Sequence, residues 1–137
     1  MTRPTAALRR DVTQRAGDRC EYCRIHQEDT ASRHQVDHII AEKHGGMTAL
    51  ENLALSCLPC NRRKASDIAA LDPKSGQLTA LFNPRTQTWS EHFQFVDAKI
   101  IGLTAEGRTT VEFLQFNSPE RTMEREELMQ SGRLQSG

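Results

Sequence analysis

The chain is poor in the residues from which a large apolar core is built. Only 5% of its 137 residues are aromatic and 36% are hydrophobic, which is a thin supply for this length. We therefore expect a single domain with a modest core, in which a metal or covalent staple adds stability.

The sequence also lacks net charge and long apolar runs. Its 18 basic and 18 acidic side chains cancel, which argues against a protein that holds nucleic acid through a large uniform basic field, although a local basic patch remains open. No apolar run approaches the length of a membrane span, and the N-terminal stretch MTRPTAALRR has charges without a hydrophobic segment behind them. We therefore expect a cytoplasmic protein with no membrane partner.

The four cysteines form two C-x-x-C pairs, Cys20 with Cys23 and Cys57 with Cys60. The pairs are separated by 33 residues (24–56), more than in a typical zinc ribbon, so a strand and a loop are expected between the two knuckles. In a reducing compartment, two matched pairs favour one zinc site over buried free thiols or a redox pair. Because the protein would fill all four positions, this zinc is expected to be structural.

The stretch QVDHIIAEKHGGMTALENLALSCLPCNRRK, residues 35–64, has the most informative pattern. Residues 35–40 alternate and are β-branched, 41–51 are rich in turn residues, and 52–56 are short and apolar, which predicts two strands joined by a long loop. The second cysteine pair then makes a knuckle, and residues 61–65 have the composition of a short helix. The predicted order is strand, loop, strand, knuckle, helix.

Polar side chains suited to metal and acid–base chemistry stand in this stretch. Asp37 and His38 are adjacent, so in a strand they point to opposite faces unless the chain bends there. With such a bend, Asp37 can hold a metal while His38 acts as general base on a nearby water. Asn52 and Asn61 supply two further polar groups, one to orient the imidazole and the other to offer a carbonyl oxygen to the metal.

The motifs CEYC, VDHI, HGG, ENL, CLPC and NRRK, in this order, resemble the HNH endonuclease family over about residues 12–64. The resemblance implies a ββα-metal core that hydrolyses DNA phosphodiester bonds. It makes His38 the general base, Asp37 and Asn61 the ligands of a catalytic divalent ion, and Asn52 the residue that steadies the loop carrying the base. It also implies a structural zinc at the cysteines and a phosphate contact at Lys64.

Two positions depart from the commonest form of the family. Asn61 stands where many members have histidine, and Ala41 stands where a proline often follows the DHI segment. Since an asparagine carbonyl is a hard oxygen donor, Asp37 and Asn61 would favour Mg²⁺ or Mn²⁺ as the catalytic ion. Arg62, Arg63 and Lys64 would place positive charge beside the phosphate backbone, with double-stranded DNA as the expected partner and no small-molecule substrate.

A second interpretation keeps the cysteines and the basic residues but not the chemistry. A zinc-stabilised nucleic-acid-binding or adaptor module would explain both, but it leaves the combination of Asp37, His38 and Asn61 without a role. The basic N-terminal end, with six arginines up to Arg24, fits a solvated helix face and a set of phosphate contacts equally well.

The remaining sequence predicts an α+β fold in which an HNH core, about residues 5–70, precedes a C-terminal extension of strands and helices, about 71–137. We expect helices over 5–16, 67–71, 104–116 and 118–132 and strands over 78–82, 93–96 and 99–103. Thr104 and Ser118 are the predicted caps of the last two helices. Four aromatic residues are expected to form a second small core around His92: Phe82, Trp89, Phe93 and Phe95.

Overall fold

The computed structural model describes residues 3–135 of the chain. They separate into two compact units, which are described one at a time. The N-terminal unit holds the described residues up to Ile68 together with Asn83–Thr86, and the C-terminal unit holds Ala69–Phe82 and the residues from Gln87 onward. Both units mix helices with small sheets, so the expected α+β class is confirmed. The single domain expected from the chain length stays a prediction.

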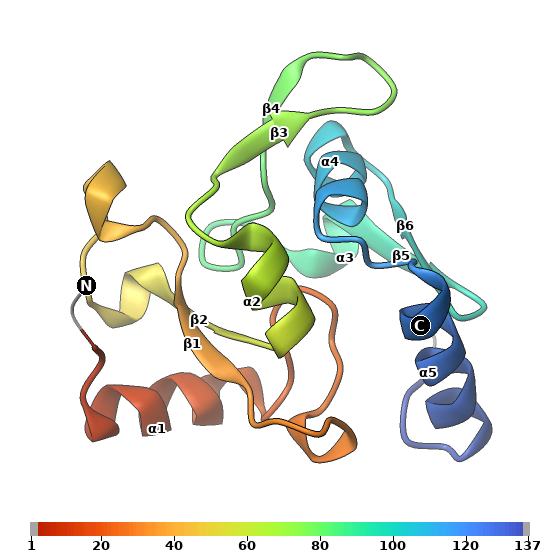
Figure 1. Ribbon diagram of the computed structural model, residues 1–137, viewed down its shortest axis with the longest axis horizontal. Helices are drawn as coiled ribbons and strands as arrows, with labels where there is room; N and C mark the ends of the chain where they lie inside the picture. The colour runs from red at the N-terminus through yellow and green to blue at the C-terminus, as the bar shows by residue number, and fades with distance from the viewer. Residues whose placement is uncertain (1–2, 136–137) are drawn as a thin grey trace. The chain divides into compact units, whose positions relative to one another are not determined.

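A β-hairpin packed between two helices forms the N-terminal unit (Figure 1). Strand β1 (Gln35–His38) pairs antiparallel with β2 (Leu53–Ser56), and the register sets Asp37 opposite Ala54. Helix α1 (Ala6–Ala16) packs on β2, and α2 (Leu58–Lys64) packs on β1. Three short 3-10 helices lie in the connecting segments: η1 (Gln27–Asp29), η2 (Glu42–His44) and η3 (Leu50–Asn52). The predicted order of strand, loop, strand, knuckle and helix is confirmed.

Helix α1 closes one face of the hairpin. Its N-cap is Thr5, whose side chain accepts a hydrogen bond from the Leu8 amide (3.2 Å), and it ends at Gly17, whose φ of 64° favours glycine. Val12 is fully buried against Leu53 and Leu55 of β2. Each such aliphatic side chain contributes about 1.5–3 kcal/mol on burial, so this small cluster fixes α1 to the hairpin.

Residues 83–86 join the N-terminal unit through a mostly buried ion pair. The Arg85 guanidinium contacts the Glu21 carboxylate and donates to the Leu53 carbonyl (3.3 Å). The second carboxylate oxygen of Glu21 accepts from the Leu55 amide at 2.8 Å. Glu21 and Arg85 are 64 residues apart in sequence, so the hairpin receives a partner from far along the chain.

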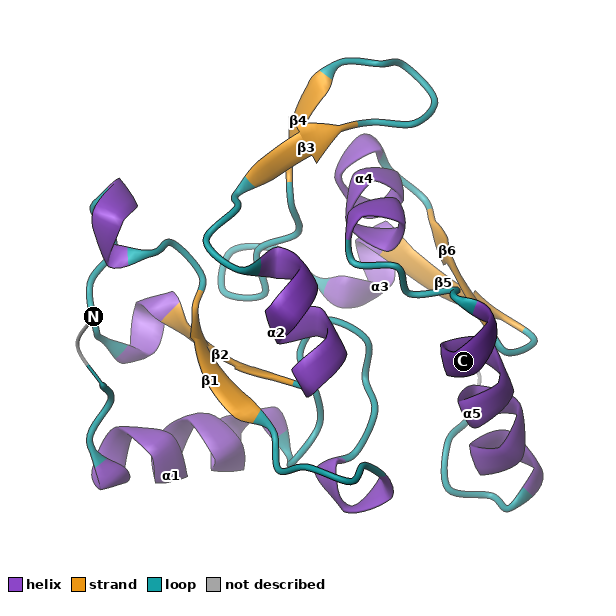
Figure 2. Cartoon of the chain, viewed as in Figure 1, coloured by secondary structure: helices purple, strands orange, loops and turns teal. Residues whose placement is uncertain are grey.

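The described residues of the C-terminal unit form two hairpins and three helices (Figure 2). Helix α4 (Ala105–Phe113) packs against β6 (Lys99–Gly102), β4 (Leu78–Ala80) and β3 (Ala69–Leu71). None of the helices within residues 3–135 is long and apolar enough to cross a membrane. The elements are β3 (Ala69–Leu71), β4 (Leu78–Ala80), α3 (Trp89–His92), β5 (Phe93–Val96), β6 (Lys99–Gly102), α4 (Ala105–Phe113) and α5 (Pro119–Gln130).

An aromatic cluster forms the core of the C-terminal unit, as predicted. Phe93 lies at its centre, with the ring centroids of Phe82 and Trp89 both at 5.1 Å. Trp89 also contacts Phe95, with ring centroids 5.4 Å apart. His92 is 8% exposed, and its Nδ1 lies 2.6 Å from the Thr104 hydroxyl. It is a packed core histidine.

The predicted helix over 67–71 is wrong. Ala69–Leu71 instead forms β3, which pairs with β4 so that Leu71 lies opposite Leu78. The caps Thr104 and Ser118 are confirmed, since each side chain accepts a hydrogen bond from an amide three residues later. The helices that follow end at Phe113 and Gln130, slightly before the predicted residues.

Candidate functional site

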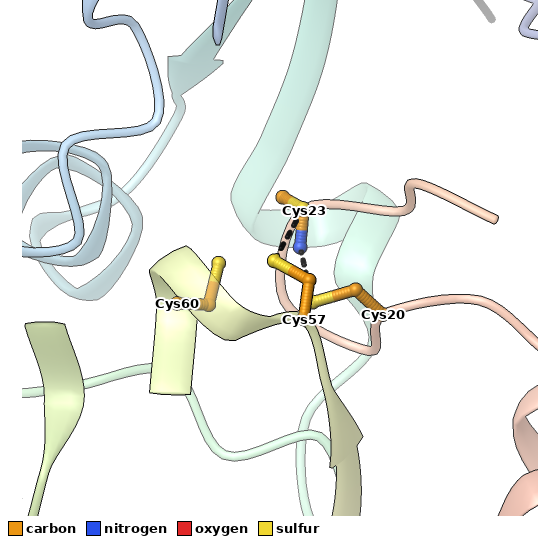
Figure 3. A group of neighbouring side chains, drawn as sticks. All are labelled: Cys20, Cys23, Cys57 and Cys60. Carbon is orange, nitrogen blue, oxygen red and sulfur yellow. Dashed lines mark hydrogen bonds between the residues drawn. The ribbon is translucent and has the colours of Figure 1, made fainter. Parts of the chain in front are cut away.

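The four cysteines converge in the N-terminal unit. Cys20 and Cys23 lie in the loop after α1, Cys57 is the N-cap of α2, and Cys60 lies in its first turn (Figure 3). All four are buried and reduced, and their sulfur atoms lie within 4.8 Å of one another. The Cys23 and Cys57 sulfurs are 3.6 Å apart, and a tetrahedral site with Zn–S bonds of about 2.3 Å sets its sulfurs about 3.8 Å apart.

The electrostatics of these thiols also favour a bound metal ion. Hydrogen bonding from Cys20 raises the pKa of Cys57, and burial raises the pKa of Cys60. Four buried thiolates would repel one another without a cation, whereas a divalent ion at their centre stabilises them. The cluster therefore has the geometry and the donor chemistry of a structural zinc site.

Tyr22, between the two cysteines of the first knuckle, connects the cluster to the predicted metal ligand Asp37. The tyrosine is 1% exposed, and its hydroxyl donates to Asp37 Oδ2 at 2.9 Å. Burial raises the pKa of Tyr22, so the phenol keeps its proton and remains a donor. Sequence reasoning did not assign this role, because the residues between the cysteines of a C-x-x-C pair are not ligands.

Lys64 is the second partner of Asp37. Its ammonium lies 3.1 Å from Oδ2 and donates to the His38 and Ile39 carbonyls at 3.3 and 2.9 Å. Burial raises the pKa of Asp37, and Lys64 and Tyr22 oppose part of that rise. With 2% exposure, Lys64 ties α2 to β1, a placement that does not fit the expected phosphate contact. Arg62 and Arg63 are exposed.

His38 lies on the other face of β1. The strand pairing continues through Asp37 and His38 without the bend that would bring them to one face, so the two side chains point to opposite faces. The His38 Nε2 lies 2.9 Å from the Thr48 hydroxyl and 4.0 Å from the Glu42 carboxylate. Thr48 has no motif signal in the sequence, and only the folded loop brings it to the imidazole.

Asn52 fastens the loop between the two strands. Its Oδ1 accepts from the Ile40 amide at 3.0 Å, and its Nδ2 donates to the Ile40 and Met47 carbonyls at 2.9 and 2.8 Å. Gly46 passes so close that a Cβ atom there would lie 1.7 Å from the Ile40 carbonyl oxygen. The loop that follows His38 is therefore held by the hydrogen bonds of Asn52 and by close packing at Gly46, where no side chain would fit.

Asn61 lies over the same face of β1 as Asp37. Its Nδ2 is 3.5 Å from Oε1 of Gln35, which is two residues before Asp37 and so shares its face. Packing of α2 on β1 therefore brings Asn61, Lys64 and Asp37 to one side of the hairpin. His38 stands on the other side.

Comparison with known proteins gives a family for this segment. A family model described as HNH endonuclease matches residues 20–67, from the first knuckle to just beyond α2. The Septu protein PtuB of Bacillus thuringiensis is 24% identical over 112 residues, which cover 80% of this chain and 41% of that protein. The chain thus spans less than half of this relative, and no solved structure matches significantly. The segment with the cysteine cluster, the β1–β2 hairpin and α2 is an HNH endonuclease domain.

Proposed function

We propose that the protein is a divalent-metal-dependent endonuclease that hydrolyses phosphodiester bonds of double-stranded DNA. The observation that carries this proposal is the placement of Asp37 and Asn61 on facing elements, with His38 as the last residue of the same strand. The proposal requires the scissile phosphate to bind over the end of β1, where residues of both faces can contact it. A domain of a nuclease family supports this use of the residues.

Asp37 and Asn61 are the proposed ligands of the catalytic ion. A carboxylate and an amide carbonyl are hard oxygen donors, which suit Mg²⁺ or Mn²⁺. Because Tyr22 and Lys64 both contact Oδ2 of Asp37, we assign Oδ1 as its ligand atom. When bound, the ion would stabilise the charge that develops on the scissile phosphate and the leaving oxygen.

His38 is the proposed general base. If Nε2 donates its proton to Thr48, Nδ1 carries the lone pair that accepts a proton from the attacking water. Asn52 acts indirectly, because its hydrogen bonds hold the loop from which Thr48 reaches the imidazole. Arg62 and Arg63 are proposed phosphate contacts, which position the backbone without reading bases. Four cysteines that hold one zinc must stay reduced, which favours the cytoplasm as the site of action.

Cleavage of supercoiled plasmid with Mg²⁺ or Mn²⁺ tests this proposal. We expect His38→Ala to lower the cleavage rate about 100- to 10,000-fold, because the base is lost while the metal ligands remain. DNA binding should persist. His44→Ala, which removes an exposed histidine of η2, is the matched control and should cleave like the unaltered protein. An undiminished rate in His38→Ala would remove the base from the mechanism.

A zinc-stabilised DNA-binding module without catalysis is the second candidate. The observation in its favour is the Lys64 ammonium, which already neutralises Asp37 at 3.1 Å. This candidate predicts DNA binding that is indifferent to Mg²⁺ and Mn²⁺, and no strand cleavage with any divalent ion. The plasmid assay separates the two functions.

A further inference from the structure

A cleft of about 850 Å³ lies beside the hairpin on the side that carries His38. Its walls come from the chain before α1, from α1 itself, from the loop before β1 and from β1. Val36 and His38 of β1 line it together with Gln35 at the start of the strand, whereas Asp37 and Lys64 do not. The cleft therefore approaches the proposed site from the side of the general base.

The lining of this cleft is basic. Among the described residues, it includes the exposed side chains of Arg3, Arg9, Arg10 and Arg33 but a single acidic residue, Asp18. Oδ1 of Asp18 already accepts a hydrogen bond from Gln27 at 2.7 Å. Since the whole chain has no net charge, this concentration of arginine is a local feature and not a consequence of composition.

The other lining residues indicate what such a cleft can hold. Guanidinium groups form paired hydrogen bonds with phosphate oxygens. Among the described residues that line the cleft there is no Phe, Tyr or Trp, the side chains on which unpaired bases stack in single-strand binders. A duplex, whose bases are already stacked on one another, needs only the phosphate contacts.

We infer that this cleft binds the phosphate backbone of double-stranded DNA through Arg9, Arg10 and Arg33 and leads it to His38. The inference rests on the proposed function and adds a binding surface to it. It gives the basic face of α1 a role in holding substrate. Because phosphate contacts carry no sequence information, the cleft should bind duplexes of any sequence with similar affinity.

The test is fluorescence anisotropy with a short labelled DNA duplex, without added Mg²⁺ or Mn²⁺ so that no cleavage occurs. The variant is Arg9→Ala/Arg10→Ala. The control is Lys74→Ala/Lys99→Ala, which removes the same charge from exposed residues outside the cleft. For the arginine variant we expect about 10- to 60-fold weaker binding near 0.1 M salt and a salt slope reduced by about 2. The control should stay within about threefold of the unaltered protein.

Equal binding by both variants, or stronger binding of single strands or of an RNA duplex through the same arginines, would overturn the inference. The outcome is separable from that of the nuclease proposal. Arginine-dependent duplex binding without cleavage under any divalent ion keeps the cleft and removes the nuclease. Metal-dependent cleavage that the arginine variant leaves unchanged, in binding and in rate, keeps the nuclease and removes the cleft.

Discussion

At the scale of single residues, the sequence predicts which residues belong to the candidate site better than it predicts which side chains contact them. Asp37, His38, Asn52 and Asn61 could be singled out because their chemical types stand at characteristic spacing. The burial of Lys64 could not, because a basic run after a knuckle gives no sign that one of its members turns inward to a carboxylate. Partners such as Thr48 and Tyr22 depend on tertiary packing, which no local pattern encodes.

Tyr22→Phe tests the connection between the first knuckle and Asp37, the proposed metal ligand. Removing one hydrogen bond from buried Asp37 should cost about 1–3 kcal/mol of unfolding free energy. It should also weaken Mg²⁺ binding, so that cleavage needs a higher Mg²⁺ concentration. Zinc content should not change, because no ligand is altered. Denaturant titration gives the unfolding free energy, titration of the cleavage rate against Mg²⁺ gives the Mg²⁺ requirement, and elemental analysis gives the zinc content. Loss of zinc would show that the tyrosine supports the knuckle instead.

Asn61→His tests whether Asn61 is a ligand of the catalytic ion. The native oxygen pair should work best with Mg²⁺ or Mn²⁺, whereas an imidazole should shift the preference toward Ni²⁺, Co²⁺ or Zn²⁺ with some activity retained. Cleavage rates across these ions, after removal of loosely bound metal from both proteins, provide the measurement. Two identical profiles would assign Asn61 to the packing of α2 on β1.

At the scale of elements, capping and periodicity predicted most of the fold. Thr104 and Ser118, the predicted caps, begin their helices because each side chain accepts a hydrogen bond from an amide three residues later. The predicted helix over 67–71 is wrong because the apolar residues of this segment suit a helix and a strand equally. The tight turn around Asp72 brings β3 beside β4, and the pairing between them stabilises the strand. Pairing across this short hairpin thus outweighs local helix propensity.

Zinc removal tests how the knuckles support α2. Cys57 is the N-cap of this helix and Cys60 lies in its first turn, so losing either ligand frees the helix that carries Asn61 and Lys64. We expect about one zinc per chain in the unaltered protein, and loss of both zinc and cooperative unfolding in Cys57→Ser or Cys60→Ser. Elemental analysis with thermal denaturation checks this. A folded, zinc-free protein would contradict it.

At the scale of the whole molecule, the N-terminal unit that contains the HNH domain is not built from one continuous segment. The matching family covers residues 20–67, but the N-terminal unit also includes α1 and residues 83–86. Through Arg85 these later residues reach Glu21 and the Leu53 carbonyl of β2. The sequence offered no sign of this return, because an arginine between two turn residues has no pattern that names its partner.

Arg85→Ala in the full chain should therefore destabilise the HNH domain. The change leaves Glu21, 8% exposed, without its cation, which should cost about 3 kcal/mol of unfolding free energy. Arg62→Ala, an exposed arginine of the same unit, should change it by less than about 0.5 kcal/mol. Denaturant titration of both variants gives the comparison.

A fragment ending at Ile68 gives the stricter form of this prediction. It keeps all four cysteines and the residues matched by the family model, but it loses Arg85. If the ion pair belongs to the domain, the fragment should bind zinc yet unfold at lower temperature than the full chain. Adding Glu21→Gln to the fragment should then do less damage than in the full chain, because the partner is already gone. A fragment as stable as the whole protein would show that the HNH domain folds without the C-terminal half, and that Arg85 only covers its surface.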